Sequence, residues 1–248
     1  MRPASWGLAR TLSSSSSRGT PGVVVTRRLP PPPCRGPART RRTRRSRNGR
    51  RRAGHAHMIV AAADVASRPL RGDGEEPGGP AVRDRYLAQG VISLEERSPG
   101  KVAVRAHNGH VATDCYAGDI PAMGRHLRSH YGERYYALGL LFGEGAFRGR
   151  PGNSATRAPR KHTIGSAGPR SVEGRLASVT PEDHIVDLRG GRALPAVAQW
   201  LQDRQFVRSF GASVPRVTYR FHPTATVLAR EYDGLAYMAR STPSTQLR

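Results

Sequence analysis

Cysteine and long apolar runs are scarce in this sequence, and each absence excludes a class of protein. The two cysteines, Cys34 and Cys115, are too few for a disulfide framework or a thiolate metal site. No apolar run reaches the ~18–20 residues that a membrane-spanning helix needs. The first residues also lack the continuous apolar segment of a secretory signal. We therefore expect a cytoplasmic protein without a membrane anchor.

Acidic residues are missing altogether from residues 1–57, which contain fifteen arginines and carry +15 of the formal net charge of +23. This stretch also contains a serine run at 13–17, a proline run at 30–33 and an arginine cluster at 39–52. Such a segment offers little apolar surface to offset the entropy lost on ordering. The sequence therefore predicts a disordered tail over residues 1–57.

The arginine cluster leaves one alternative open, which is binding to the phosphates of a nucleic acid. No aromatic side chain lies among these arginines to stack on bases. We therefore keep nucleic-acid binding only as an alternative and do not expect a nucleic acid as partner.

Beyond the tail, a change of composition marks the start of the folded part. Residues 58–80 are predicted to be a linker, because they end in a run of Gly, Pro and acidic residues. The folded part is expected over residues 81–248. With about +8 of net charge left, this part has the charge of an ordinary basic domain.

Apolar periodicity in the folded part predicts helices that alternate with strands. Val82–Arg97 has apolar side chains at helical spacing, and Asp119 with Pro121 marks the start of a second helix that ends near Tyr131. Loops are expected at 143–147 and 148–170. Further strands are expected at 135–142, 185–188, 206–210 and 235–238, and further helices at 171–177 and 194–202. This alternation favours an α/β fold.

The segment after the first helix combines local structure with reactive side chains. The apolar run that begins at Lys101 is typical of a buried strand, and it stops at His107-Asn108-Gly109-His110. In open α/β sheets, ligands and catalytic groups collect at strand ends. His107 and His110 are therefore candidate general acids, general bases or carbonyl-polarising groups. The alternative is that they are polar loop residues, or that one is a buried histidine bonded to backbone.

Three other patterns do not carry chemistry. His126 and His130 share a helix face, but Leu127 stands where the metalloprotease motif needs glutamate. Gly143–Gly149 is not a phosphate-binding loop, because Arg148 takes the place of the third glycine. The G-x-S-x-G elbow of serine hydrolases is missing from the sequence.

Several motifs together resemble the erythromycin esterase family. They are Arg83-Asp-Arg-Tyr-Leu-Ala88, Val102-Ala-Val-Arg-Ala-His-Asn-Gly-His-Val111, Met123-Gly124 with Leu127 and Tyr131-Gly132, Gly139 with Phe142-Gly143, and Tyr232-Asp-Gly-Leu-Ala-Tyr237 with Thr242-Pro243. The Ala-His-Asn-x-His element is the strongest of them. The similarity runs from about Ala81 to the C-terminus.

The resemblance implies a mixed sheet with flanking helices, and hydrolysis of a carboxylic ester such as a macrolide lactone. It implies a histidine base that activates water, without a metal or other cofactor, and a small-molecule ester as partner. The Ala-His-Asn-x-His histidines correspond to His107 and His110, which line the same cleft. The family places its base, with a partnering glutamate, in an N-terminal half that we expect this chain to lack.

Two hypotheses follow from the resemblance. One is a truncated esterase with weak or no activity, in which His107 and His110 orient water or polarise the carbonyl. The other is a catalytically dead remnant that binds a ligand. Hydrolysis of a simple ester that depends on His107 would favour the first.

Overall fold

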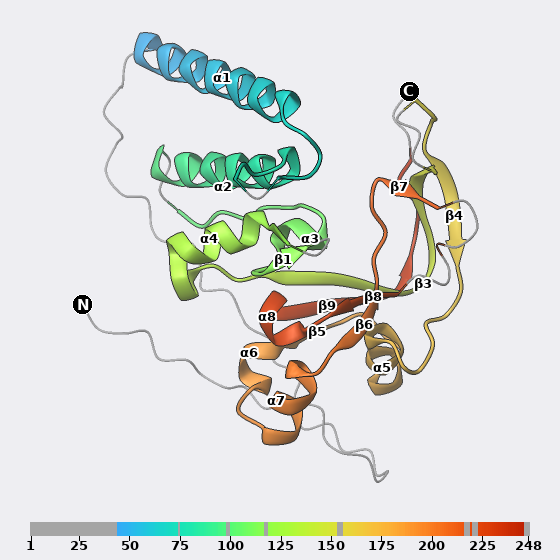
Figure 1. The fold of residues 1–248 in the computed structure, drawn as a ribbon. Helices are drawn as coiled ribbons and strands as arrows, with labels where there is room; N and C mark the ends of the chain where they lie inside the picture. Colours follow the sequence, from blue (N-terminus) through green and yellow to red (C-terminus); the bar gives the residue numbers. More distant parts are fainter. Residues whose placement is uncertain are drawn as a thin grey trace.

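A computed structural model gives the fold of the chain (Figure 1). It describes residues 44–73, 75–97, 100–116, 119–152, 156–215, 219 and 223–245, with the backbone alone for 44–53. Residues 1–43, most of the expected tail, lie outside the described residues. The helices are α1 (Arg44–Ser67), α2 (Gly79–Arg97), α3 (Asn108–Val111), α4 (Met123–Tyr131), the 3₁₀-helix η1 (Gly132–Arg134), α5 (Val172–Val179), α6 (Leu188–Gly191), α7 (Pro195–Gln202) and α8 (Leu228–Glu231).

A mixed five-stranded sheet forms the centre of the molecule, in the order β4-β3-β9-β5 with β7 added beside β3. β3 pairs in parallel with β9 and β7, and antiparallel with β4; β5 pairs antiparallel with β9. Two smaller pairs, β1-β2 and β6-β8, lie beside it. The strands are β1 (Cys115–Tyr116), β2 (Ile120–Pro121), β3 (Leu138–Pro151), β4 (Arg160–Ile164), β5 (His184–Asp187), β6 (Gln205–Arg208), β7 (Ser213–Val214), β8 (Pro223–Thr226) and β9 (Gly234–Ser241).

Helices flank this sheet on both sides, as expected from the alternating pattern. In Figure 1, α1 to α4 lie on one side of β3 and β9, and α5 to α8 lie on the other. The core between them is built from aliphatic side chains that are almost fully buried. They include Leu127, Leu141, Val172, Leu201, Leu228 and Leu235. The α/β class and the mixed sheet are confirmed.

The strand predicted from Lys101 is wrong. Residues 101–106 have no regular structure, and His107 to Val111 form the start and body of the short helix α3. Val102 and Val104 are 41 % and 38 % exposed, so the segment lies on the surface. A strand needs a partner for its backbone groups, and none of the described strands pairs with this segment.

The loops predicted at 143–147 and 148–170 are also wrong in large part. Strand β3 continues to Pro151, and β4 pairs with it from Gly145 to Gly149. The glycines allow neighbouring chains to come close: a Cβ on Gly143 would lie 2.1 Å from the Tyr237 hydroxyl of β9. Glycines that suggest a turn in sequence thus serve close packing within the strand.

Helix α1 covers residues 44–67, which include the end of the expected tail and much of the expected linker. The division of the chain into tail, linker and folded part stays a prediction. Tyr86 of α2 donates a hydrogen bond to Asp64 of α1, at 2.8 Å between Oη and Oδ2, which joins the two helices. None of the described helices is long and apolar enough to cross a membrane.

Candidate active site

A buried carboxylate holds one of the two candidate histidines. Asp84 lies on α2 and has no exposed surface, and its Oδ1 is 2.7 Å from Nδ1 of His110. Because a carboxylate oxygen accepts, the proton between them is assigned to Nδ1. The lone pair of a neutral imidazole is then on Nε2. The His110 side chain is 24 % exposed, so a small molecule can reach its ring.

Four donors surround the Asp84 carboxylate, which explains why a charged group is tolerated in the interior. Besides His110, Oδ1 accepts from the backbone N–H of Met123 at 3.0 Å. Oδ2 accepts from the Tyr116 hydroxyl at 2.8 Å and from Nη2 of Arg83 at 3.2 Å. Since Met123 is the first residue of α4, Asp84 also satisfies an N–H that the helix itself leaves free. The same carboxylate therefore fixes α4 and orients His110.

Tyr116 completes the surroundings of His110. Its ring packs edge-on against the imidazole, with 5.3 Å between ring centroids. Burial and the hydrogen bond to Asp84 raise the pKa of Tyr116 to about 12, so its hydroxyl stays a donor at neutral pH. Arg83 donates a further hydrogen bond to this hydroxyl at 2.8 Å. The His110 ring is thus held by its hydrogen bond to Asp84 and by packing against the Tyr116 ring.

His107 lies beside His110, with 6.3 Å between the ring centroids, but it is engaged differently. Its Nδ1 accepts a hydrogen bond of 3.1 Å from the N–H of Gly109, so the side chain caps helix α3. The backbone of Phe210 lies beside the ring. Desolvation, together with the charge that His110 can acquire, lowers the pKa of His107. Protonation of Nδ1 would break the cap, so the neutral form is the one that fits.

Asn108 explains how these histidines are fixed against the sheet. Its Nδ2 donates to the carbonyl of Leu140 at 2.8 Å, and its Oδ1 accepts from the N–H of Leu140 at 3.0 Å. The side-chain amide thus pairs with β3 as another strand would. The predicted position at the end of a strand from Lys101 is therefore wrong, and Asn108 instead holds the two histidines beside β3 through its side chain.

Asp84 and Tyr116 were not identified from sequence as site residues. The spacing of Val82, Tyr86 and Leu87 predicted an apolar face of α2 that does not include Asp84. The buried face instead contains Val82, Asp84 and Ala88, whereas Leu87 is 44 % exposed. One feature of the sequence could have pointed to Asp84. It lies in the Arg-Asp-Arg motif that the chain shares with the family, but the resemblance gave this aspartate no function.

The second histidine pair gives no metal site. His126 lies half-buried on α4 and His130 is exposed near the end of that helix. Among the described residues, no group of three or more His, Cys, Asp or Glu side chains is arranged to hold a metal ion.

Comparison with solved structures finds three that are similar to this chain. A protein from Bacillus cereus has 22 % identity and a TM-score of 0.58, and the match covers 68 % of this chain and 41 % of that one. A succinoglycan biosynthesis protein has 19 % identity and a TM-score of 0.56, covering 66 % and 39 %. An erythromycin esterase mutant in its open conformation has 19 % identity and a TM-score of 0.46, covering 66 % and 38 %. The chain thus spans about two fifths of the length of the structures it matches.

The comparison with curated proteins gives no match. The sequence profile of the family described as erythromycin esterase matches residues 35–241. This match begins well before Ala81, where we expected the family-like part to start, and it includes residues assigned to the tail and the linker. Because the profile covers most of the 248 residues, the chain belongs to the erythromycin esterase family.

Proposed function

We propose that this chain takes part in the hydrolysis of a carboxylic ester, with His110 as the residue that orients and deprotonates water. The observation that carries the proposal is the 2.7 Å contact between Nδ1 of His110 and the buried Asp84. A carboxylate in this position fixes the tautomer that leaves Nε2 as an acceptor, and it stabilises the imidazolium that forms in the reaction.

The proposed step balances without a further reactant. The water oxygen attacks the ester carbonyl carbon, and the water proton moves to Nε2 of His110. When the tetrahedral intermediate collapses, the bond to the alcohol oxygen breaks and Nε2 returns the proton to that oxygen. Tyr116 and Asp84 act on this step through His110 and are positioning residues.

His107 contributes to the same site in this proposal by holding the loop and lining the wall. Its Nδ1 accepts from the N–H of Gly109, and the backbone of Phe210 lies beside the ring. A macrolide lactone is one ester that the family membership suggests for testing. The chain spans about two fifths of the length of the solved structures that it matches. We therefore also propose that the chain is active without a further segment.

The test is hydrolysis of 4-nitrophenyl acetate and of a macrolide lactone by the purified chain. We expect His110→Ala to lower kcat by about 10²-fold or more, the usual contribution of a general base. The control is His130→Ala, which removes an exposed histidine of α4 that is not part of the site and should leave kcat unchanged. If the intact chain hydrolyses neither ester faster than His110→Ala, the chain is a remnant that binds ligands at most.

A second variant separates positioning from folding. Asp84→Asn keeps the size of the side chain but weakens the hold on His110, so we expect a lower kcat and a shifted pH profile with KM little changed. Tyr116→Phe removes one donor to Asp84 and should have a smaller effect in the same direction. A pH profile identical to that of the intact chain in Asp84→Asn would remove Asp84 from the mechanism.

A further inference from the structure

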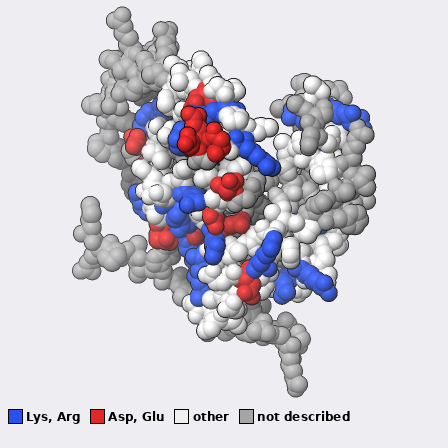
Figure 2. All heavy atoms as spheres, in the orientation of Figure 1, with Lys and Arg blue, Asp and Glu red and all other residues white. Residues whose placement is uncertain are grey.

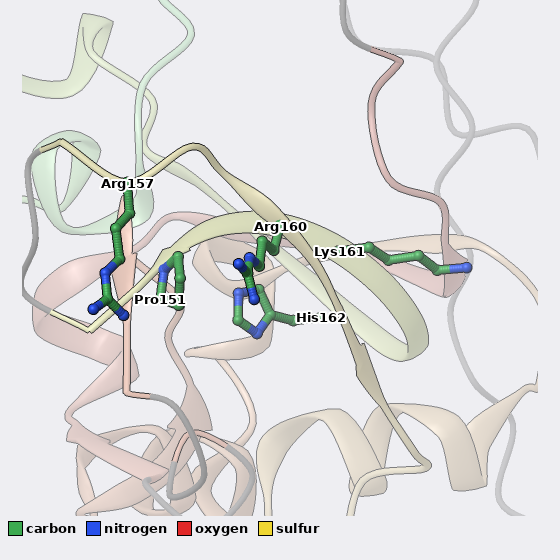
Figure 3. A pocket seen from close by; sticks show the side chains of 5 residues that line it. All are labelled: Pro151, Arg157, Arg160, Lys161 and His162. Atoms are coloured by element: carbon green, nitrogen blue, oxygen red, sulfur yellow. The ribbon is translucent and has the colours of Figure 1, made fainter.

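Cationic side chains surround a pocket at the end of the β3-β4 hairpin where β3 ends and β4 begins, away from the candidate active site. The pocket has a volume of about 530 Å³ and is lined by Pro151, Arg157, Arg160, Lys161 and His162. In the view of Figure 3, Arg157 and Arg160 lie on either side of Pro151, with His162 below Arg160 and Lys161 extending the other way. This arrangement follows from the strand period, because residues 160 and 162 share one face of β4.

The positive charge of this region is not balanced by its surroundings. Residues 148–170 contain six Arg and Lys residues and no Asp or Glu. None of Arg157, Arg160 and Lys161 forms an ion pair with a carboxylate of the described part of the chain. On the visible described surface of the lobe that carries β4 and β7, Figure 2 shows Lys and Arg side chains without Asp or Glu.

The floor of the pocket is rigid. Pro151 ends β3 and is buried, and His162 is only 8 % exposed. Nε2 of His162 donates to the carbonyl of Gly149 at 3.1 Å, which fixes the ring across the hairpin. Phe147 stacks on the other side, with 5.5 Å between ring centroids. The arginine side chains therefore share the pocket with two residues, Pro151 and His162, that are fixed by burial.

We propose that this pocket binds an anionic oxygen group, a phosphate or a carboxylate. Guanidinium groups bind such groups through paired, charge-assisted hydrogen bonds, and two of them that line one pocket can bind the same anion. An anion would also relieve the repulsion between the like charges that the hairpin brings together.

The anion has two possible sources, a free phosphate or the charged end of the ester substrate. The second rests on the proposed function and is favoured by a row of rings that leads toward the candidate active site. From His162 the ring contacts pass to Phe147 and then to Phe210, with 4.3 Å between the last two centroids, and the backbone of Phe210 lies beside His107. An ester with an apolar middle and a negative end matches this sequence of surfaces.

Calorimetric titration of the full chain with inorganic phosphate tests the site without any enzymatic activity. We expect saturable binding that weakens at high salt, and an affinity at least tenfold lower for Arg157→Gln/Arg160→Gln, since a hydrogen bond to a charged group is worth about 1.5–3 kcal/mol. The control is Arg71→Gln/Arg204→Gln, which removes the same charge from two exposed arginines elsewhere and should bind as the intact chain does. No binding, or an equal loss in both double variants, overturns the proposal.

Kinetics distinguish the two sources. 4-Nitrophenyl monoesters of dicarboxylic acids of increasing length are compared with uncharged esters of the same lengths. If the pocket holds the charged end of the substrate, Arg157→Gln/Arg160→Gln lowers kcat/KM at least tenfold for a charged ester and leaves that of its uncharged match unchanged. If the double substitution changes kcat/KM equally for the charged and the uncharged esters, the pocket binds a free anion and not the charged end of the substrate. If neither series is hydrolysed by the intact chain, the proposed function fails while the phosphate titration still decides the site.

Discussion

Two buried aspartates show how single residues organise this molecule. Asp84 orients His110 and caps α4, whereas Asp233 joins the start of β3 to helices α4 and α6. Asp233 accepts from Nε of Arg189 at 2.8 Å and from the N–H of Ala137 at 2.7 Å, and it pairs with Arg128. Burial alone would raise the pKa of Asp233, but these donors and charges hold it below its ordinary value. Both aspartates come from family motifs, and neither is exposed enough to meet a substrate directly.

At the residue scale, His107 can be tested by a pair of substitutions. In His107→Asn, the amide Oδ1 takes the position of Nδ1 and can still accept from the N–H of Gly109. In His107→Ala the cap is lost, which typically costs about 1 kcal/mol. We expect thermal melts to rank the intact chain and His107→Asn close together and His107→Ala below both. If His107 does chemistry on the substrate, both variants lose activity; if it only caps α3, His107→Asn keeps it.

The lowered pKa of His107 adds a pH dependence to this pair. The unfolded chain binds a proton at this histidine more readily than the folded chain, so folding gains stability as pH rises toward neutrality. Stability should therefore be fully present above pH ~6.5 and decline as pH falls through the range below it. Chemical denaturation between pH 7.5 and 5 should show a smaller decline for His107→Asn than for the intact chain. If the free energy of unfolding falls equally with pH in both proteins, His107 is not the residue that causes the decline.

At the scale of elements, the site depends on the contact between α3 and α4. The end of α3 comes so close to α4 that a Cβ on Gly124 would lie 2.2 Å from the carbonyl oxygen of Val111 and 2.4 Å from that of Ala112. The Tyr135 hydroxyl holds the same segment by donating to the Val111 carbonyl at 2.7 Å. Because both obstacles are backbone atoms, no side-chain movement can make room.

Gly124→Ala should therefore force α3 and α4 apart and destabilise the chain by about 1–3 kcal/mol, as overpacking usually does. The matched control is Gly90→Ala on α2, where nothing lies within 4 Å of the added Cβ. That change should stabilise the chain by roughly 0.5–1 kcal/mol, because alanine favours a helix over glycine. Urea denaturation of the two variants measures both effects. Equal stability of the two variants would show that α3 and α4 are free to shift.

At the scale of the whole molecule, the outer helices present an apolar surface. A groove of about 1090 Å³ runs between α1 and α2, and Met58, Ala62, Leu87 and Leu94 are among its lining residues. Met58 is 68 % exposed and Leu94 is 53 % exposed. Exposed apolar surface of this kind favours association between molecules.

We expect the purified chain to self-associate through this groove. Met58→Gln/Leu94→Gln should lower the fraction of oligomer measured by analytical ultracentrifugation at a given concentration, since the apolar area that drives association is reduced. Ile185→Gln/Val179→Gln alters two exposed side chains on other elements, at 64 % and 71 % exposure, and serves as the control. A monomeric intact chain, or equal effects of the two double variants, would contradict this expectation.

Local patterns in the sequence were enough to predict some elements because the physical cause is itself local. Helix α2 follows from its apolar spacing, and α5 begins where Ser171 caps it, with Oγ accepting from the N–H of Gly174 at 3.1 Å. β9 lies where a strand was expected near residues 235–238. The family motifs likewise led to His107 and His110, and the structure brings these two rings together.

What the sequence by itself determined is therefore the α/β class, the four helices α2, α4, α5 and α7, and the neighbourhood of the two histidines, because helical periodicity and capping act within a few residues. Only the tertiary structure decided that residues 101–106 form no strand, that the glycines of 143–149 lie within β3, and that Asp84 holds His110. Each of these depends on contacts between residues far apart in the chain: Asp84 and His110 are separated by 26 positions and belong to different helices. A buried carboxylate acquires its role from the donors that folding brings to it, and no local pattern contains them.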